Sequence, residues 1–68
     1  RADLIYIDGS HEEEDVYQDL LDYHGLLNPG GKIFGDDWGW SGVRAAVERF
    51  AAENRIPIRH LHDKWILG

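Results

Sequence analysis

Carboxylates and a histidine stand where apolar runs of the sequence end. Asp8 directly follows the apolar run Leu4–Ile7, and Asp36 with Asp37 follows a second run. His11 lies three residues beyond Asp8. Carboxylate oxygens suit a hard cation, Mg²⁺ first and then Mn²⁺ or Ca²⁺, and a histidine, with an ordinary pKa of about 6.5, suits a general base. These residue types predict a metal site with a base beside it, provided that the fold brings them together.

Four short segments rich in β-branched and aromatic residues are predicted strands, and they alternate with helical patterns. The order β-α-β-α-β-β predicts an α/β fold with a mostly parallel, partial Rossmann-like sheet and right-handed crossovers. The predicted strands are Leu4–Ile7, Lys32–Gly35, Ile58–His62 and Trp65–Leu67, with a two-residue turn at Asp63-Lys64 between the last two.

Two amphipathic stripes predict the helices. The first helix is expected to begin at a capping box made by Ser10 and Glu13 and to end at Asn28–Gly31. The second is expected to begin with Ser41 as its cap. The predicted buried stripes are Val16, Leu20, Tyr23 and Leu27 in the first helix and Val43, Ala46, Val47, Phe50 and Ala51 in the second.

In an open α/β sheet, ligands bind outside the carboxyl ends of the strands. Asp8, Asp36 and Asp37 follow such ends, so parallel strands would gather three carboxylates with His11 beside them. Each aspartate alone has an ordinary structural alternative, because aspartate often caps a helix. His11 could equally be a solvated histidine in the first helical turn. We favour a metal site because the three carboxylates occupy matching positions.

Aromatic and histidine residues near the second acidic corner leave alternatives open. Trp38 and Trp40 either form the wall of a substrate pocket or pack against the end of the sheet. His60 and His62 share a strand face, which is more often an edge surface than a metal site. His24 lies late in its helix, where a cation is favoured without any function.

Composition excludes several classes of function. The 68 residues carry a formal charge of −6, which disfavours binding to nucleic acid or to an anionic membrane. No apolar run reaches the roughly 20 residues of a membrane span. The chain has no cysteine, which fits a reducing compartment, and we expect a cytoplasmic protein. It also has no methionine and enters a strand almost at once, so we expect a piece of a longer protein.

The segment order closely resembles that of a known enzyme family. The resemblance rests on DLIYIDGSHEEEDVYQDLLDYHGLLNPGGKIFGDDW followed by GVRAAVERFA, and the elements IDGSH, L-x-PGG and GDD are fairly specific together. This stretch is similar to the carboxyl-terminal half of class I S-adenosylmethionine-dependent methyltransferases, nearest to small O-methyltransferases. The resemblance implies that residues 1–68 form the carboxyl-terminal portion of one such domain, from its fourth strand onward.

The resemblance also implies roles for particular residues. In metal-dependent relatives the ion is held at the positions of Asp8, Asp36 and Asp37, and the base stands at the position of His11. The substrate would be a small hydroxyl compound, such as a sugar or natural product. The chain contains no G-x-G-x-x-G loop, so no cofactor-binding residue is assigned. We expect the parent protein to be the methyltransferase and this chain alone to be inactive.

The sequence also allows two other functions, and it predicts one partner. A metal-dependent hydrolase could use the same carboxylates to activate water, and a non-catalytic module could use the acidic face. The strand Leu4–Ile7 would pair in the family's sheet with a strand that this chain lacks. We therefore expect an exposed apolar edge and a homo-oligomer formed through it.

Overall fold

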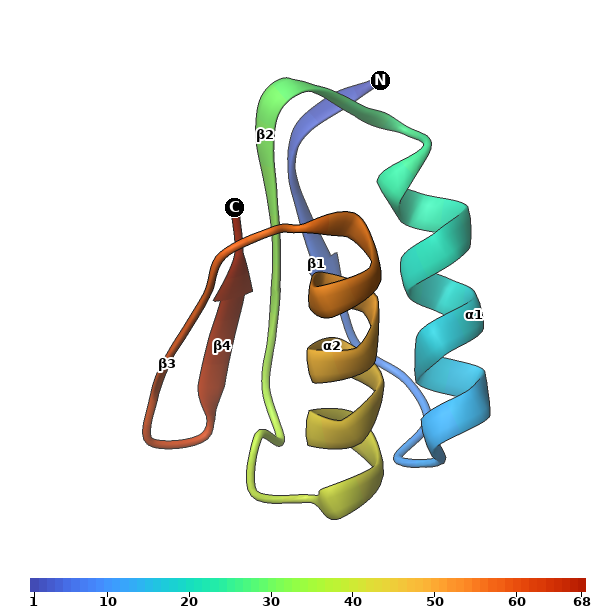
Figure 1. Ribbon diagram of the computed structural model, residues 1–68, viewed down its shortest axis with the longest axis vertical. Coiled ribbons are helices and arrows are strands. Elements are labelled where there is room, and N and C mark those ends of the chain that lie inside the picture. Colours follow the sequence, from blue (N-terminus) through green and yellow to red (C-terminus); the bar gives the residue numbers. More distant parts are fainter.

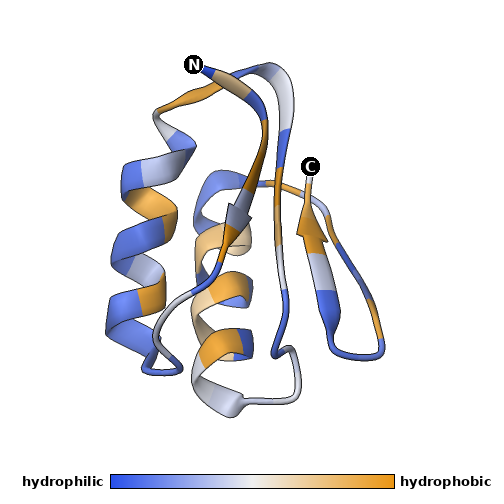
Figure 2. Ribbon diagram, turned by 180° about the vertical axis from the view of Figure 1, so that it is seen from behind, coloured by the Kyte–Doolittle hydropathy of each residue, from blue (hydrophilic) through white to orange (hydrophobic).

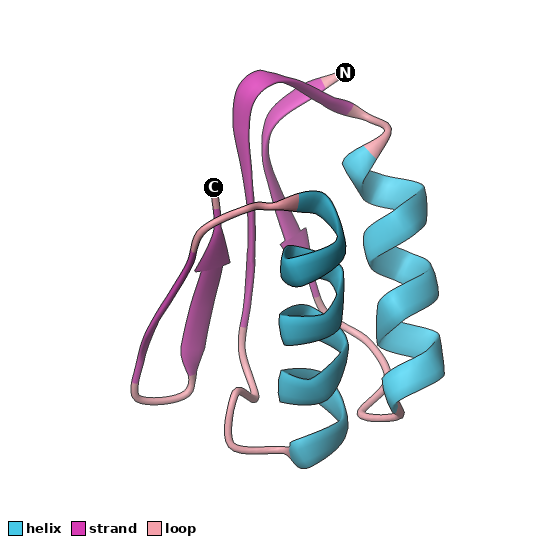
Figure 3. Cartoon of the chain, viewed as in Figure 1, coloured by secondary structure: helices cyan, strands magenta, loops and turns pink.

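The computed structural model describes residues 1–68 as one sheet with both helices on the same face (Figures 1 and 3). Seen from behind, the strands stand in front of the helices, and no helix covers that face (Figure 2). The fold is therefore a two-layer α/β structure with one open sheet face. The elements are β1 (Ala2–Ile7), α1 (Glu13–His24), β2 (Leu27–Gly35), α2 (Ser41–Asn54), β3 (Ile58–Leu61) and β4 (Lys64–Leu67).

The prediction of a mostly parallel sheet is wrong. The strand order is β1-β2-β4-β3, and only β1 and β2 are parallel. The two-residue turn that joins β3 to β4 is His62-Asp63, one residue earlier than predicted, and His62 has a positive φ of 56°. This hairpin folds β4 back between β2 and β3, so β4 runs antiparallel to both neighbours.

The core lies between the helices and one sheet face. In α2 the whole predicted stripe is buried. In α1 only Val16 and Leu20 of the predicted stripe are buried. Tyr23 lies in the helix but is exposed, and Leu27 belongs to β2. The sheet and the loop after β2 supply the other core residues, which are Ile7, Ile33, Trp38, Trp65 and Leu67.

Three predicted helix boundaries are also wrong. Neither helix has a side-chain cap. The Ser10 hydroxyl accepts a hydrogen bond from the Glu12 backbone N–H at 3.0 Å, in the loop before α1, so Ser10 and Glu13 form no capping box. Ser41 is already inside α2. The segment Asn28–Gly31 belongs to β2 rather than ending a helix, and its four residues face only Asp3 of β1 because the register shifts there.

Candidate functional site

Two loops and a hairpin turn meet at one end of the sheet, at the bottom of Figure 1. The loops follow β1 and β2, and the turn joins β3 to β4. The Trp38 backbone N–H donates to the Asp63 carbonyl oxygen at 2.9 Å, which ties the loop after β2 to the turn. Gly42, in the first turn of α2, packs against the backbone at His11 and Glu13. The carboxyl ends of the parallel strands therefore carry the predicted site residues, as expected for an open α/β sheet.

His11 has two partners at this end. Its Nε2 lies 3.0 Å from Oδ2 of Asp37. Its ring stacks on the indole of Trp40, with ring centroids 4.1 Å apart and planes 7° from parallel. A carboxylate on one ring nitrogen fixes the orientation of an imidazole and, where that nitrogen carries the proton, leaves the other nitrogen with a lone pair. The structure thus joins His11, Asp37 and Trp40 into one arrangement, with Nδ1 of His11 as the nitrogen that has no protein partner.

Asp36 is held by a different set of side chains. The Tyr6 hydroxyl donates to Oδ2 of Asp36, and the Lys64 ammonium donates to Oδ1. The hydrogen bond from Lys64, and then that from Tyr6, hold the pKa of Asp36 below its usual range. The same carboxylate raises the pKa of Tyr6 to about 12 and raises the pKa of Lys64. The indole N–H of Trp65 donates to the Asp36 backbone oxygen at 2.9 Å, which anchors the residue itself.

The three aspartates line a common small cavity but do not form a group of metal ligands. Asp8, Asp36 and Asp37 border a space of about 20 Å³, which holds roughly one water molecule. No three histidine or acidic side chains come together as a group that could hold a metal ion. Two of the three carboxylates are already bonded to other side chains. As arranged, the residues do not fit a divalent ion, and the metal-binding role of these aspartates stays a prediction.

The two tryptophans occupy different environments. Trp38 is only 7% exposed, belongs to the core and stacks on the His60 ring with centroids 4.9 Å apart. Trp40 is 56% exposed beside His11. Of the two predicted substrate-binding residues, Trp40 is the one whose ring a ligand can reach. The stack on Trp38 gives His60 a packing contact, whereas His62 lies in the hairpin turn.

Sequence reasoning did not single out Tyr6 and Lys64. The predicted turn at Asp63-Lys64 leaves Lys64 in a loop, whereas in the structure it opens β4 and pairs with Leu61. A turn one residue earlier would have placed Lys64 beside the end of β2. The apolar run Leu4–Ile7 predicts a strand but does not indicate that Tyr6 is 46% exposed on the open face.

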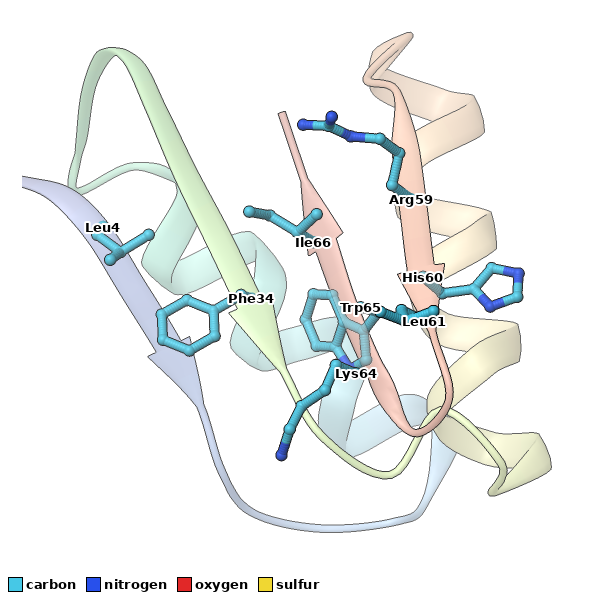
Figure 4. Close-up of a pocket in the computed structure, with 8 residues that line it drawn as sticks. All are labelled: Leu4, Phe34, Arg59, His60, Leu61, Lys64, Trp65 and Ile66. Carbon is cyan, nitrogen blue, oxygen red and sulfur yellow. The ribbon is translucent and has the colours of Figure 1, made fainter.

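The largest hollow of the molecule lies on the open sheet face, and none of the three aspartates lines it. It has a volume of about 500 Å³. Figure 4 shows Leu4, Phe34 and Ile66 on this side of three adjacent strands, with Lys64 near the lower end of β4. The residues that line it are Leu4, Phe34, Arg59, His60, Leu61, Lys64, Trp65 and Ile66.

An open α/β sheet with polar residues at the carboxyl ends of its parallel strands is the frame of many nucleotide- and cofactor-dependent enzymes. The sequence model of a methyltransferase domain matches residues 1–38, which is 38 of 68 residues. The chain therefore belongs to this family of methyltransferase domains. The matched segment includes Asp8, His11 and the Asp36-Asp37 pair. No curated protein matches the chain.

Methyltransferases of this kind in general use S-adenosylmethionine. The cavity at the strand ends has room for about one water molecule, so it does not hold this cofactor. Neither α1 nor α2 has the length and apolar character needed to span a bilayer.

Proposed function

We propose that the chain is the carboxyl-terminal part of an S-adenosylmethionine-dependent methyltransferase that methylates a hydroxyl group, with His11 as the general base. The observation that carries this proposal is the contact of 3.0 Å between Nε2 of His11 and Oδ2 of Asp37. An imidazole oriented by a carboxylate is the usual arrangement of a histidine that removes a proton from an oxygen nucleophile.

The proposed chemistry uses the free nitrogen of the imidazole. Nε2 keeps its proton toward Asp37, and Nδ1 takes the proton of the substrate hydroxyl as the oxygen forms its new bond to carbon. S-adenosylmethionine, when bound to the longer enzyme, would supply the methyl group and the sulfur leaving group. Asp37 stabilises the imidazolium that forms, because a carboxylate at hydrogen-bond distance favours the charged ring.

Trp40 supports a small, partly apolar substrate beside His11. One face of its exposed indole covers the imidazole, and a flat ring of this kind also packs well against the apolar face of a sugar or of an aromatic natural product. The same stack limits rotation of the His11 ring. A substrate hydroxyl would then meet a base whose direction is fixed in advance, which is how positioning lowers a barrier.

The geometry gives less support to functions that depend on a metal ion at the three aspartates. A metal-dependent hydrolase needs several ligands around one ion, whereas Asp36 and Asp37 are bonded to Lys64, Tyr6 and His11. Mg²⁺ as a helper of methyl transfer faces the same objection.

The test uses the longer enzyme that contains this chain. His11→Gln keeps a hydrogen-bond donor but cannot accept the proton at neutral pH, so we expect kcat to fall by about 100-fold or more. His24→Gln is the matched control, because His24 lies at the end of α1, and we expect nearly full activity from it. If the His11 variant kept wild-type kcat and the same pH–rate profile, His11 would not be the base.

A further inference from the structure

Lys64 is placed beside Asp36 by the backbone. β4 runs antiparallel to β2, with Gly35 opposite Trp65 and Phe34 opposite Ile66. The next position along each strand in this register brings Asp36 opposite Lys64. Opposite charges on directly facing positions of neighbouring strands attract each other. The pair is therefore a consequence of the strand register and does not depend on one chance side-chain conformation.

The contacts around Asp36 use both of its carboxylate oxygens. Lys64 donates to Oδ1 and Tyr6 to Oδ2. The neighbouring carboxylate, Asp37, is bonded to His11. A divalent ion at this end of the sheet would have to displace Lys64, break the Tyr6 hydrogen bond and accept a positive charge close by. Of the three predicted metal ligands, only Asp8 has a side-chain carboxylate without a hydrogen-bond partner.

We propose that Lys64 takes the place of a divalent cation at Asp36, so that the chain itself neutralises this carboxylate. An ammonium group is a compact point charge with three donors, and it can satisfy a carboxylate without any metal ligand set. Trp65, the residue after Lys64, also bonds to the Asp36 backbone oxygen and keeps the two strands together there. If the proposed function holds, methyl transfer by the longer enzyme would need no Mg²⁺.

The effect of Lys64 on cation binding depends on how exposed Lys64 and Asp36 are. The Lys64 side chain is 72% exposed and that of Asp36 is 30% exposed, so solvent and salt weaken their attraction. Removal of Lys64 also removes a positive charge that would repel a divalent ion a few ångströms away. Together these effects predict at least about fivefold tighter cation binding in the absence of Lys64.

The experiment measures Mn²⁺ binding to the chain by paramagnetic broadening of backbone NMR signals at low ionic strength. Lys64→Met is compared with Lys32→Met, a matched control that removes the same charge from β2, where no ion pair involves Lys32. We expect millimolar binding for the wild type and for the control. We expect binding at least about fivefold tighter for Lys64→Met, with broadening centred on Asp36, and loss of this gain when Asp36→Asn is added.

Two results would overturn the inference. One is micromolar Mn²⁺ binding to the wild-type chain, and the other is a Lys64→Met variant that binds no more tightly than Lys32→Met. Signal dispersion in the NMR spectra shows whether each variant is folded, and Lys64→Gln replaces Lys64→Met if the latter is not. Because the readout is cation binding, the outcome does not depend on whether the enzyme methylates a hydroxyl group.

Discussion

Gly42 and His11 are in direct backbone contact: a Cβ added to Gly42 would overlap the carbonyl oxygen of His11. The same added atom would lie 3.1 Å from the backbone nitrogen of Glu13. The first turn of α2 is therefore seated directly on the loop that carries His11. This contact couples the start of one helix to the position of the proposed base.

Substitution of Gly42 tests that coupling. We expect Gly42→Ala to reduce the free energy of unfolding by about 1–3 kcal/mol, because overpacking against backbone atoms forces the loop or the helix to move. We also expect the NMR signals of the His11 ring to shift as it leaves Asp37 and Trp40. Gly39→Ala is the control, since its Cβ would meet only Oδ1 of Asp63 at an ordinary 3.5 Å. Equal denaturation midpoints for the two variants would show that the contact is not tight.

The tyrosine that bonds to Asp36 predicts a titration at high pH. Tyr6 has its pKa raised to about 12, first by its hydrogen bond to Asp36 and then by burial and nearby carboxylates. A folded-state pKa above the ordinary value of about 10 means that Tyr6 stabilises the fold below pH 10. This contribution is lost as the pH rises through about 12.

Absorbance at the tyrosinate band measures this titration directly. We expect a step near pH 12 in the wild type that loses the amplitude of one tyrosine in Tyr6→Phe and moves to lower pH in Asp36→Asn. Tyr17, whose pKa is raised by its hydrogen bond to Glu53, contributes a separate rise that both variants keep. Tyr23→Phe is the matched control, because Tyr23 lies on α1 and touches neither Asp36 nor Lys64, and it should leave the step in place. A Tyr6 step that stays at the same pH in Asp36→Asn would mean that the hydrogen bond to Asp36 does not form in solution.

Helix α2 shows what local patterns can predict. Val43, Ala46, Val47, Phe50 and Ala51 recur at helical spacing, and all five are buried against the sheet. Apolar residues at this spacing lie on one face only if the segment is a helix, so the pattern predicts both the helix and its buried face. The strand ends before the acidic residues were predictable for a similar reason, because Leu4–Ile7 and Ile33-Phe34 are apolar and β-branched or aromatic.

Strand order and the partners of Asp36 depend on contacts between distant residues. The position of the hairpin turn decides whether Lys64 lies in a loop or begins β4, and a shift of one residue moves each side chain to the other face of a strand. The sequence around Asp63 permits either position. In the structure the turn His62-Asp63 places Trp65 over Gly35, where no larger residue fits, and thereby places Lys64 beside Asp36.

The two sheet edges differ in how well they are protected. β1 lies at one edge, and the stretch Leu4–Ile7 carries no charge. β3 forms the other edge, has only four residues and includes Arg59 and His60. Short, charged edge strands resist pairing with another chain, whereas longer apolar ones invite it. We therefore propose that the chain self-associates through β1.

The simplest assembly is a two-fold dimer in which two β1 strands pair in antiparallel fashion. With Ile5 on the axis, Leu4 of one copy faces Tyr6 of the other, and both side chains are exposed in the single chain. We expect sedimentation at micromolar concentration to give a dimer for the wild type and a monomer for Leu4→Lys. Leu61→Lys, which adds the same charge at a 70% exposed leucine on β3, should remain a dimer. A wild-type chain that sediments as a monomer and melts cooperatively would show that four strands and two helices are sufficient alone.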